Sequence, residues 1–371
     1  MESREFGFGI EAEFIIASNK DFAPLSHRDL NSDRLQALIN GIQTADISTD
    51  GLNLKPLHTK ISPYLLEGYY LTDENMKPTS LLAKGIEIRT PRTNCIQESL
   101  TNLQSLYSRL QEALATERYA PVILSHHPTE ANLEAPPNYA RHDYWQWALT
   151  ATTTFGPDIN ISLPSEWSEK IDLAKLNAKI NHYGPAAVAL TLASPLVHGD
   201  LWHIRGRVGK SIRTYRRSIW APLFYVHHKP SLRFEFKGFE MSQSLDDYRA
   251  FFLMSLAILT DDTLAGQASD QSRIYDLGEI AICGLESSIT RQRAQYVLEG
   301  AEKIASRLSL QRTGLDEMWS RVDSNRVPAD EIIEIYEREK SIPKTMKCLA
   351  NFHAPQFQRT AQALPHSQLI K

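Results

Sequence analysis

The chain has 371 residues, of which 42% are hydrophobic and 23% are charged, and its formal net charge at pH 7 is −4. This composition is typical of globular proteins and excludes the disordered, collagen-like and disulfide-scaffold classes. The small excess of acidic residues provides no general attraction to nucleic acid, so we expect no nucleic-acid partner.

Cysteine usage and the lack of export or membrane signals indicate the compartment. Cys95, Cys283 and Cys348 are widely spaced without a CxxC motif, so we expect neither a disulfide framework nor a cysteine-rich zinc site. Residues 1–5 lack the apolar core of a secretory signal. The longest mostly apolar stretch, 185–197, is shorter than the roughly 18 residues of a membrane helix. We therefore expect a soluble cytoplasmic protein with no membrane partner.

Taken in chain order, four short segments alternate between apolar and polar residues, which is the pattern of strands with one buried face. These segments lie at residues 6–14, 86–89, 158–163 and 232–237. Helical periodicity is found at 97–117, at 251–259 after a predicted N-cap at Ser244, at 277–310 and at 328–340.

The order of these elements predicts the fold class. Early strands and a mostly helical last third, beginning near residue 244, predict an α+β protein with an antiparallel or mixed sheet covered by helices. We expect residues 1–352 to form a single domain. Residues 353–371 combine prolines and polar residues with little periodicity, so we expect a flexible tail there.

The polar sides of the four predicted strands carry acidic residues. Glu11 and Glu13 alternate with apolar residues, so they project from one face of their strand about 7 Å apart. If Glu87, Asp158 and Glu235 join them from neighbouring strands, five carboxylates share one surface, where unpaired acids repel one another and raise one another's pKa. Divalent cations bound through oxygen, Mg2+ or Mn2+, relieve such repulsion. A solvated sheet face is the alternative explanation for each strand taken alone.

A basic segment lies between His198 and Trp220. It contains, interleaved with Gly206 and Gly209, the cations Arg205, Arg207, Lys210, Arg213, Arg216 and Arg217. We interpret it as a flexible loop that closes over phosphates, because Arg offers bidentate contacts and Lys a point charge. A solvated helix face and a nucleic-acid patch are the alternatives, but no aromatic-rich strand motif supports the latter. No P-loop motif is present.

An acidic face and a basic segment together predict phosphoryl transfer. In that chemistry divalent cations neutralise phosphate oxygens, and basic side chains stabilise the charge that develops on the transferring group. The spacing of Ser, Cys and His residues indicates no catalytic triad. The adjacent residues His126 and His127 are either structural or supply one direct contact to a substrate.

Several short motifs, ordered along residues 6–260, resemble the carboxylate–amine ligase family that includes the bacterial type 2 glutamate–cysteine ligases. They are Gly9–Phe14, Gly85–Pro91, His127–Pro128, Tyr139–Arg141, Leu190–Gly199 and Phe234–Lys237. The resemblance implies a glutamine-synthetase-like catalytic domain, in which a curved, mainly antiparallel sheet forms a funnel-shaped site. It also implies an ATP-dependent ligase that forms a C–N bond. A carboxylate is phosphorylated, and an amine then displaces phosphate from the acyl phosphate to give an amide, such as a γ-glutamyl amide.

The resemblance assigns Glu11, Glu13, Glu87 and Glu235 as ligands of Mg2+ or Mn2+. Asp158 stands where the family commonly has a metal-binding histidine, so an oxygen ligand replaces a nitrogen ligand there. Lys237 stands where the family has arginine, which keeps the charge but loses the bidentate fork.

The remaining assignments concern ATP and two small-molecule substrates, a carboxylate and an amine. Substrate contacts are expected from Arg89, His127, Arg141 and Asn160. Nucleotide contacts are expected from Lys210, Arg213, Arg216 and Lys237. Catalytic roles are expected from Arg213, Arg217 and Lys237.

Two alternatives remain open. The first is phosphoryl transfer to a nitrogen acceptor on the same fold, with no bond formed afterwards. The second is a non-catalytic sensor of a nucleotide or carboxylate, in which Asp158 and Lys237 mark lost activity. The sequence specifies neither the two substrates nor the oligomeric state, for which a homodimer is one option.

Overall fold

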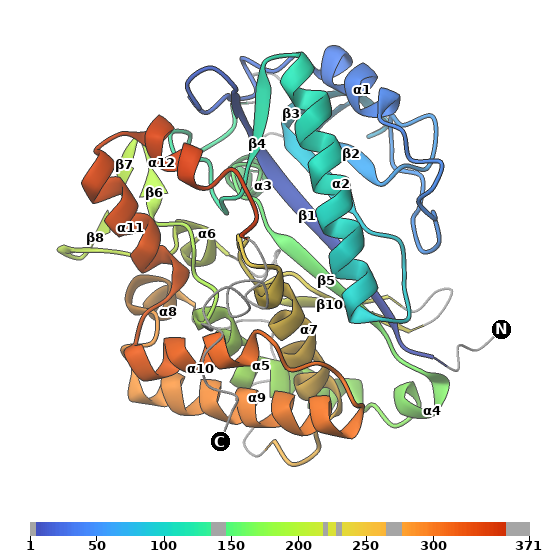
Figure 1. Ribbon diagram of the computed structural model, residues 1–371, viewed down its shortest axis with the longest axis vertical. Helices are drawn as coiled ribbons and strands as arrows, with labels where there is room; N and C mark the ends of the chain where they lie inside the picture. Colours follow the sequence, from blue (N-terminus) through green and yellow to red (C-terminus); the bar gives the residue numbers. More distant parts are fainter. Residues whose placement is uncertain (1–4, 135–145, 218–221, 228–231, 265–276, 354–371) are drawn as a thin grey trace, which may run out of the picture.

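A computed structural model describes residues 5–134, 146–217, 222–227, 232–264 and 277–353 (Figure 1). Its centre is a seven-stranded sheet with strand order β10-β11-β5-β1-β3-β2, in which β4 also pairs with β1. Every pair of neighbouring strands in it is antiparallel. The strands are β1 (Gly7–Ser18), β2 (Tyr64–Thr72), β3 (Pro78–Arg89), β4 (Tyr119–Val122), β5 (Pro157–Ser162), β10 (Phe224–His227) and β11 (Arg233–Phe236).

The long strand β1 organises this sheet. One of its edges pairs with β3 through residues 11–15. The other edge pairs with β5 through residues 7–12 and with β4 through residues 15–18. Three strands from later parts of the chain therefore pair with β1.

Helices cover the apolar face of the sheet. Ile10, Ala12 and Phe14 of β1 are completely buried on this face, beneath α2 (Ile96–Thr116) and α7 (Leu245–Thr260). The leucines of α2 recur at helical intervals and are buried, and each such side chain contributes about 1.5–3 kcal/mol by leaving water. Figure 1 shows α2 lying across the strands. The helices hold one face of the sheet rigidly and leave the polar face to build a site.

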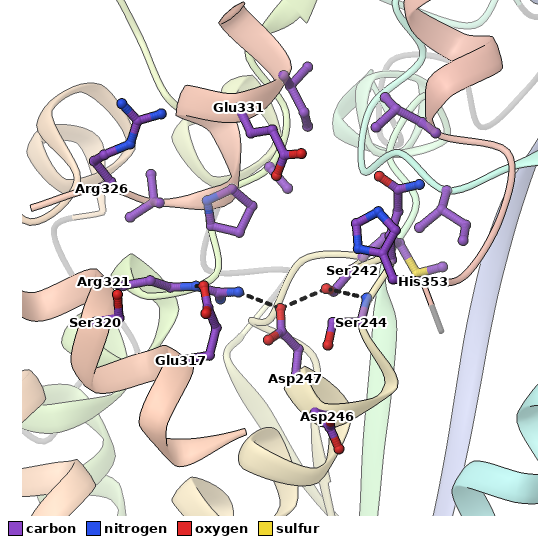
Figure 2. Close-up of a pocket in the computed structure, with 18 of the residues that line it drawn as sticks. Ser242, Ser244, Asp246, Asp247, Glu317, Ser320, Arg321, Arg326, Glu331 and His353 are labelled. Carbon is purple, nitrogen blue, oxygen red and sulfur yellow. Dashed lines mark hydrogen bonds and ion pairs between the residues drawn. The ribbon is translucent and has the colours of Figure 1, made fainter. Parts of the chain in front are cut away.

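The remaining elements follow the sheet strands or connect them. The two short hairpins are β6 (Leu196–Val197) with β7 (Asp200–Leu201) and β8 (His203–Ile204) with β9 (Arg207–Val208). The other helices are α1 (Ser32–Gly41), α3 (Gln146–Ala151), α4 (Ser165–Ser168), α5 (Leu173–Ala189), α6 (Ile212–Tyr215), α8 (Gly278–Cys283), α9 (Ser288–Arg307), α10 (Leu315–Ser324), α11 (Pro328–Glu339) and α12 (Ile342–Cys348). A cavity lies where α7, α10 and α11 meet (Figure 2).

All four predicted strands are found, as β1, β3, β5 and β11, and the predicted helices at 97–117 and 328–340 are α2 and α11. Ser244 occupies the N-cap position of α7, although its side chain makes no capping hydrogen bond. The α+β prediction is confirmed. From α7 onward every described element is a helix.

The prediction of one helix over 277–310 is wrong, because the chain forms two helices there. Gly284 ends α8 with a positive φ of 60°, a conformation that interrupts a right-handed helix and suits glycine. Ser287 then starts α9 by accepting a hydrogen bond from the Thr290 backbone N–H. Helical periodicity on both sides of the break concealed it.

Two further expectations concern the C-terminal tail and membrane-spanning helices. The predicted tail, 353–371, lies outside them except for His353. Within the described ranges, no helix combines the length and the apolar content needed to cross a membrane.

Candidate active site

The strand register brings the acidic side chains onto one face of the sheet. Glu11 of β1 lies opposite Asp158 of β5 on one side and opposite Arg89 of β3 on the other. Glu13 lies opposite Glu87. Since side chains on one strand alternate between faces, these residues share the face opposite Ile10, Ala12 and Phe14. The predicted convergence of acids from separate strands is present in the structure.

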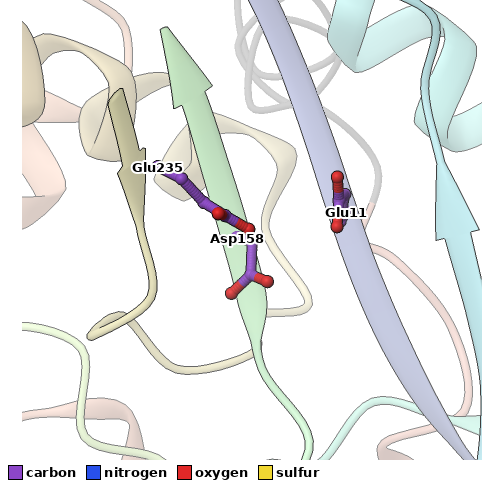
Figure 3. A group of neighbouring side chains, drawn as sticks. All are labelled: Glu11, Asp158 and Glu235. Atoms are coloured by element: carbon purple, nitrogen blue, oxygen red, sulfur yellow. The ribbon is translucent and has the colours of Figure 1, made fainter. Parts of the chain in front are cut away.

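The first carboxylate group consists of Glu11, Asp158 and Glu235, from β1, β5 and β11 (Figure 3). One oxygen from each of the three lies within 4.8 Å of the others. Lys237 Nζ donates a hydrogen bond to the Asp158 carboxylate and another, of 2.8 Å, to Glu235 Oε1. His227 Nε2 lies 2.5 Å from the second Glu235 oxygen. A lysine therefore serves as the counter-ion of this group.

The two acids that contact Lys237 differ in their titration. Burial, reinforced by the neighbouring Glu235 and Glu11 charges, outweighs the attraction of Lys237 and raises the pKa of Asp158 to about 7. Burial also opposes ionisation of Glu235, but Lys237 and the His227 hydrogen bond outweigh it and lower the pKa of Glu235 to about 2. The rise in pKa was expected for unpaired acids, and it does not occur at Glu235 because Lys237 and His227 are its partners.

The second carboxylate group consists of Glu13, Glu67 and Glu87, from β1, β2 and β3. Its ligand oxygens also lie within 4.8 Å of one another. Lys84 Nζ donates to Glu13 Oε1 at 3.0 Å and to the Thr154 carbonyl at 2.7 Å. Burial and the repulsion of neighbouring carboxylates raise the pKa of Glu87 well above its ordinary value, and the pKa of Glu67 is raised for the same reasons. Both carboxyls therefore favour their protonated form more than a free glutamate does.

Glu67 was not expected from the sequence. It is the single acid in the apolar and aromatic strand Tyr64–Thr72, and that isolation is the signal that could have identified it. The pairing of β2 with β3 shifts register between Glu67 and Gly68. A Cβ at Gly68 would lie 2.0 Å from the Leu82 carbonyl oxygen, so glycine permits this close approach. Before this shift the pairing is regular and sets Leu65 opposite Glu87 and Glu67 opposite Gly85, so Glu67 shares the face of Glu87.

Basic and histidine side chains at the edge of the face were also missed. Arg233 donates a hydrogen bond to the Asn160 side-chain oxygen, and its guanidinium lies 4.0 Å from Glu11. Arg233 shares the alternation of β11 with Glu235 and Lys237, so strand parity was the available signal. Lys84 lies on β3 and His227 lies on β10, and only contacts made in the folded protein bring them to the acids.

The predicted substrate contacts occupy different environments. Arg89 is fully buried, and its guanidinium donates to the carbonyl oxygens of Asn53 and Ser62. Asn160 lies beside the first carboxylate group, opposite Glu235. His127 accepts a 3.0 Å hydrogen bond from the Glu130 backbone N–H, and burial lowers its pKa to about 4, so it is neutral at pH 7.

Arg141 lies outside the described residues. Arg89 therefore anchors the loop that precedes β2, whereas Asn160 is placed to reach a ligand on the acidic face. The substrate role of each of these residues stays a prediction.

The basic segment differs from the loop expected. It forms the two short hairpins and α6, and its cations have separate partners. Arg205 pairs with Glu279 at 3.3 Å, Arg207 with Glu286, and Lys210 with Asp330 at 2.5 Å. Acids later in the chain, on α8, on α11 and between α8 and α9, thus hold these side chains apart, and any contact with phosphate stays a prediction.

Three arginines at the end of the segment bind backbone carbonyls. Arg213 donates to the Lys237, Gly238 and Phe239 carbonyl oxygens, Arg216 to that of Ala131, and Arg217 to that of Pro222.

Arg213 is the one that approaches the acidic face most directly. A Cβ at Gly156 would lie 2.0 Å from Arg213 Nη2, and the Gly156 N–H donates to Glu13 Oε2 at 3.0 Å. Because Gly156 has no side chain, the Arg213 guanidinium packs directly behind the second carboxylate group.

The model of glutamate–cysteine ligase family 2 matches residues 7–251, which is more than half of the chain. The chain belongs to this family. The match covers all six acids of the two carboxylate groups. It confirms the resemblance seen in the motifs. Among curated proteins, no sequence matches this chain significantly.

Solved structures show the same fold at low sequence identity. A bifunctional glutathione synthetase from Pasteurella multocida is 14% identical with a TM-score of 0.64 over 97% of this chain, which spans only 53% of that protein. A glutamate–cysteine ligase from Francisella tularensis, solved with AMP, is 11% identical with a TM-score of 0.59. The similarity covers 100% of this chain and 91% of that ligase.

The Pup ligase PafA, solved with Pup, is 12% identical with a TM-score of 0.55, over 99% of this chain and 78% of that one. These likenesses confirm the expected fold class. The chain spans about half the length of the glutathione synthetase.

The chemistry of the two carboxylate groups suits hard divalent cations. Each group offers three oxygen ligands and no sulfur, as Mg2+ and Mn2+ prefer. Without a metal ion, Lys237 offsets the negative charge of the first group, and the raised pKa of Glu87 reduces the negative charge of the second. Glu11, Glu13, Glu67, Glu87, Asp158 and Glu235 therefore fit a metal-binding role.

Proposed function

We propose that this chain is an ATP-dependent ligase that joins a carboxylate to an amine, with an acyl phosphate as intermediate and Mg2+ as the metal cofactor. Its place in glutamate–cysteine ligase family 2 supports the reaction class. The observation that carries the proposal is the pair of adjoining carboxylate groups on one sheet face, bordered by Lys237 and Arg233.

The two carboxylate groups would hold the metal ions. Glu11, Asp158 and Glu235 provide one set of oxygen ligands, and Glu13, Glu67 and Glu87 provide the other. When bound, Mg2+ supplies positive charge that neutralises the phosphate oxygens of ATP.

The chain itself supplies orientation and charge. Lys237 is held protonated because Asp158 and Glu235 outweigh the effect of burial and raise its pKa, so it can donate to a phosphate oxygen when a metal ion takes its carboxylate partners. Arg233 and Asn160 lie together at the border of the face, where they can orient the substrate carboxylate. Arg213 supports Lys237 from behind through its backbone carbonyl. The helix-covered opposite face keeps these strands from shifting.

Oxygen-18 labelling of the carboxylate substrate tests the proposal. Carboxylates and amines are screened in pairs with MgATP for release of ADP. If an acyl phosphate forms and the amine displaces phosphate, one labelled oxygen passes from the carboxylate to inorganic phosphate for each ADP formed. We expect Glu11→Ala and Glu235→Ala to abolish turnover, whereas Glu337→Ala, on the exposed side of α11, retains it.

Other outcomes separate the alternatives. Unlabelled phosphate would exclude the acyl phosphate, and retained turnover in both Glu11→Ala and Glu235→Ala would exclude the metal assignment. An N-phosphate product without phosphate release would indicate a phosphotransferase. Nucleotide binding without ADP release for any pair would indicate a sensor.

A further inference from the structure

A cavity of about 680 Å³ lies apart from the acidic face of the sheet, between the first turn of α7, the helix α10 and the first turn of α11 (Figure 2). None of the six acids of the two carboxylate groups lines it. Its volume falls within the range of about 300–1,000 Å³ that is typical of small-molecule sites. The proposed ligase reaction does not use this cavity.

The cavity lining has an apolar part and a polar part, which are called here its apolar floor and its polar walls. Its apolar lining residues are Ile123, Ala193, Met241, Leu245, Val327, Pro328, Ile332 and Leu349. The polar walls come from Ser242 to Asp247, from one side of α10, and from the beginning of α11. A ligand that matches both parts has an aliphatic stem and a polar head.

The charges of the walls are unbalanced. The lining acids number five against two arginines, a difference of −3, and they are Asp246, Asp247, Glu317, Glu331 and Glu334 against Arg321 and Arg326. Arg326 is paired with Glu334 at 2.6 Å, and Arg321 with both Asp247 at 2.7 Å and Glu317 at 3.6 Å. Asp246 pairs at 3.8 Å with Arg249, which does not line the cavity, so with this arginine counted five acids face three arginines, a difference of −2. The net negative charge favours a cation over an anion.

Asp247 provides an independent indication of a missing donor. Only 1% of its surface is exposed, and its carboxylate projects from α7 at the cavity wall (Figure 2). Oδ2 accepts hydrogen bonds from Arg321 and from Ser242 Oγ, whereas Oδ1 is buried without a partner. A buried carboxylate oxygen without a donor is costly, and a bound donor would remove that cost.

The geometry favours an organic cation over a metal ion. Among the described residues, groups of three acids with ligand oxygens within 4.8 Å of one another occur on the sheet and not in this cavity. The cavity acids are spread over three helices, and Glu331 lies across the space from Asp247 (Figure 2). Two separated negative positions above an apolar floor suit two ammonium groups joined by methylene groups.

We propose that the cavity between α7, α10 and α11 is a binding site for an aliphatic diamine. One ammonium group donates to Asp247 Oδ1 and the other lies beside Glu331. The methylene chain lies on the apolar floor, as the stems of lysine side chains do on apolar surfaces.

Calorimetric titration of the purified full-length protein, with Mg2+ in excess to occupy the acidic face, tests this site. The probes are 1,4-diaminobutane, 1-aminobutane and 1,4-butanediol. We expect saturable binding of the diamine, binding of the monoamine weaker by at least about threefold, and no binding of the uncharged diol. Absence of diamine binding, or equal binding of the diol, would overturn the proposal.

Matched variants locate the binding. Asp247→Asn keeps an oxygen for Arg321 and Ser242 but places an amide NH2 where the unpaired oxygen was, so diamine affinity is expected to fall about tenfold. Glu331→Gln changes an exposed residue and is expected to lower affinity about threefold, whereas Glu337→Gln on the same helix leaves it unchanged. If Asp247→Asn does not fold, Glu331→Gln decides the question. Loss of binding in Glu11→Gln, or unchanged binding in Glu331→Gln, would place the diamine elsewhere and overturn the site.

Discussion

The two carboxylate groups contain the same number of acids, yet they compensate for the repulsion in different ways. In the first, Lys237 binds two of the three acids, and Glu235 is ionised with a pKa near 2. In the second, Lys84 contacts only Glu13, and burial together with neighbouring charge raises the pKa of Glu67 and Glu87. Lys237 offsets the charge of the first group, in which Asp158 also titrates near pH 7, whereas in the second group the raised pKa values favour protonation.

Under the proposed function, each group would hold a cation. In the first group the cation would take the carboxylates that Lys237 contacts, and this would leave the ammonium group to bind phosphate. In the second group it would compete with protons, so its affinity would depend on pH. Removing the counter-ion from each group in turn tests the distinction most directly.

The largest effect is expected for Lys237→Met. Asp158 and Glu235 then remain buried without their cation, so the unfolding free energy at pH 7 without metal should fall by about 3–5 kcal/mol. Lys84→Met removes one ion pair and one hydrogen bond to a carbonyl, and the loss should be about 1–2 kcal/mol. Denaturant titrations of both variants give the comparison. Equal losses would show that the two lysines are equivalent.

Replacing one acid in each group separates ionised from protonated carboxyls. The lowered pKa of Glu235 contributes stability that is present above the unfolded pKa of about 4.5 and is lost as pH falls through about 2. Glu235→Gln should therefore lower the unfolding free energy at pH 7 by about 2–3 kcal/mol.

For Glu87 the pKa shift has the opposite sign. The raised pKa of Glu87 destabilises the folded state as pH rises above the unfolded value, so an uncharged amide is tolerated. Glu87→Gln should change the unfolding free energy by less than about 1 kcal/mol while weakening Mg2+ binding. A loss as large as that of Glu235→Gln would show that Glu87 is ionised in the metal-free protein.

Metal binding should release protons from groups whose pKa is raised. At pH 6.5 more than half of Asp158, with a pKa of about 7, is protonated, so Mg2+ binding should release up to about one proton from it and tighten as pH rises toward 7. The raised pKa of Glu87 should add to this release. Calorimetry in two buffers of different ionisation enthalpy measures this number. Glu87→Gln should reduce it, and an unchanged release would remove Glu87 as a proton source.

The smallest effect is expected outside the sheet. Arg205 forms an exposed pair with Glu279, so Arg205→Ala should change the unfolding free energy by no more than about 0.5 kcal/mol and leave the KM for ATP unchanged. Arg213→Met removes a buried guanidinium that binds carbonyl oxygens behind Lys237, so it should destabilise by about 2–3 kcal/mol. A raised KM in Arg205→Ala would instead support the phosphate-binding loop.

Some parts of the site were accessible from local sequence. Alternation with a period of two is a property of a single strand, so it identified Glu11, Glu13, Glu87, Asp158 and Glu235 and placed each on the polar side of its strand. It did not reveal Glu67, because the strand around it is apolar and aromatic without alternation, and only the pairing with β3 places it on the acidic face. The basic segment was misinterpreted for a related reason, since Glu279, Glu286 and Asp330, which bind its cations, lie far along the chain.

The sequence by itself determined which residues form strands, which side of each strand is polar, and which family the motifs resemble, because these properties depend on neighbours along the chain. Only the tertiary structure decided how the six acids divide into two groups. It also decided that Lys237 offsets the charge of one group, whereas raised pKa values reduce the charge of the other. This difference depends on strand order and burial, which set the distance between charges and their access to water.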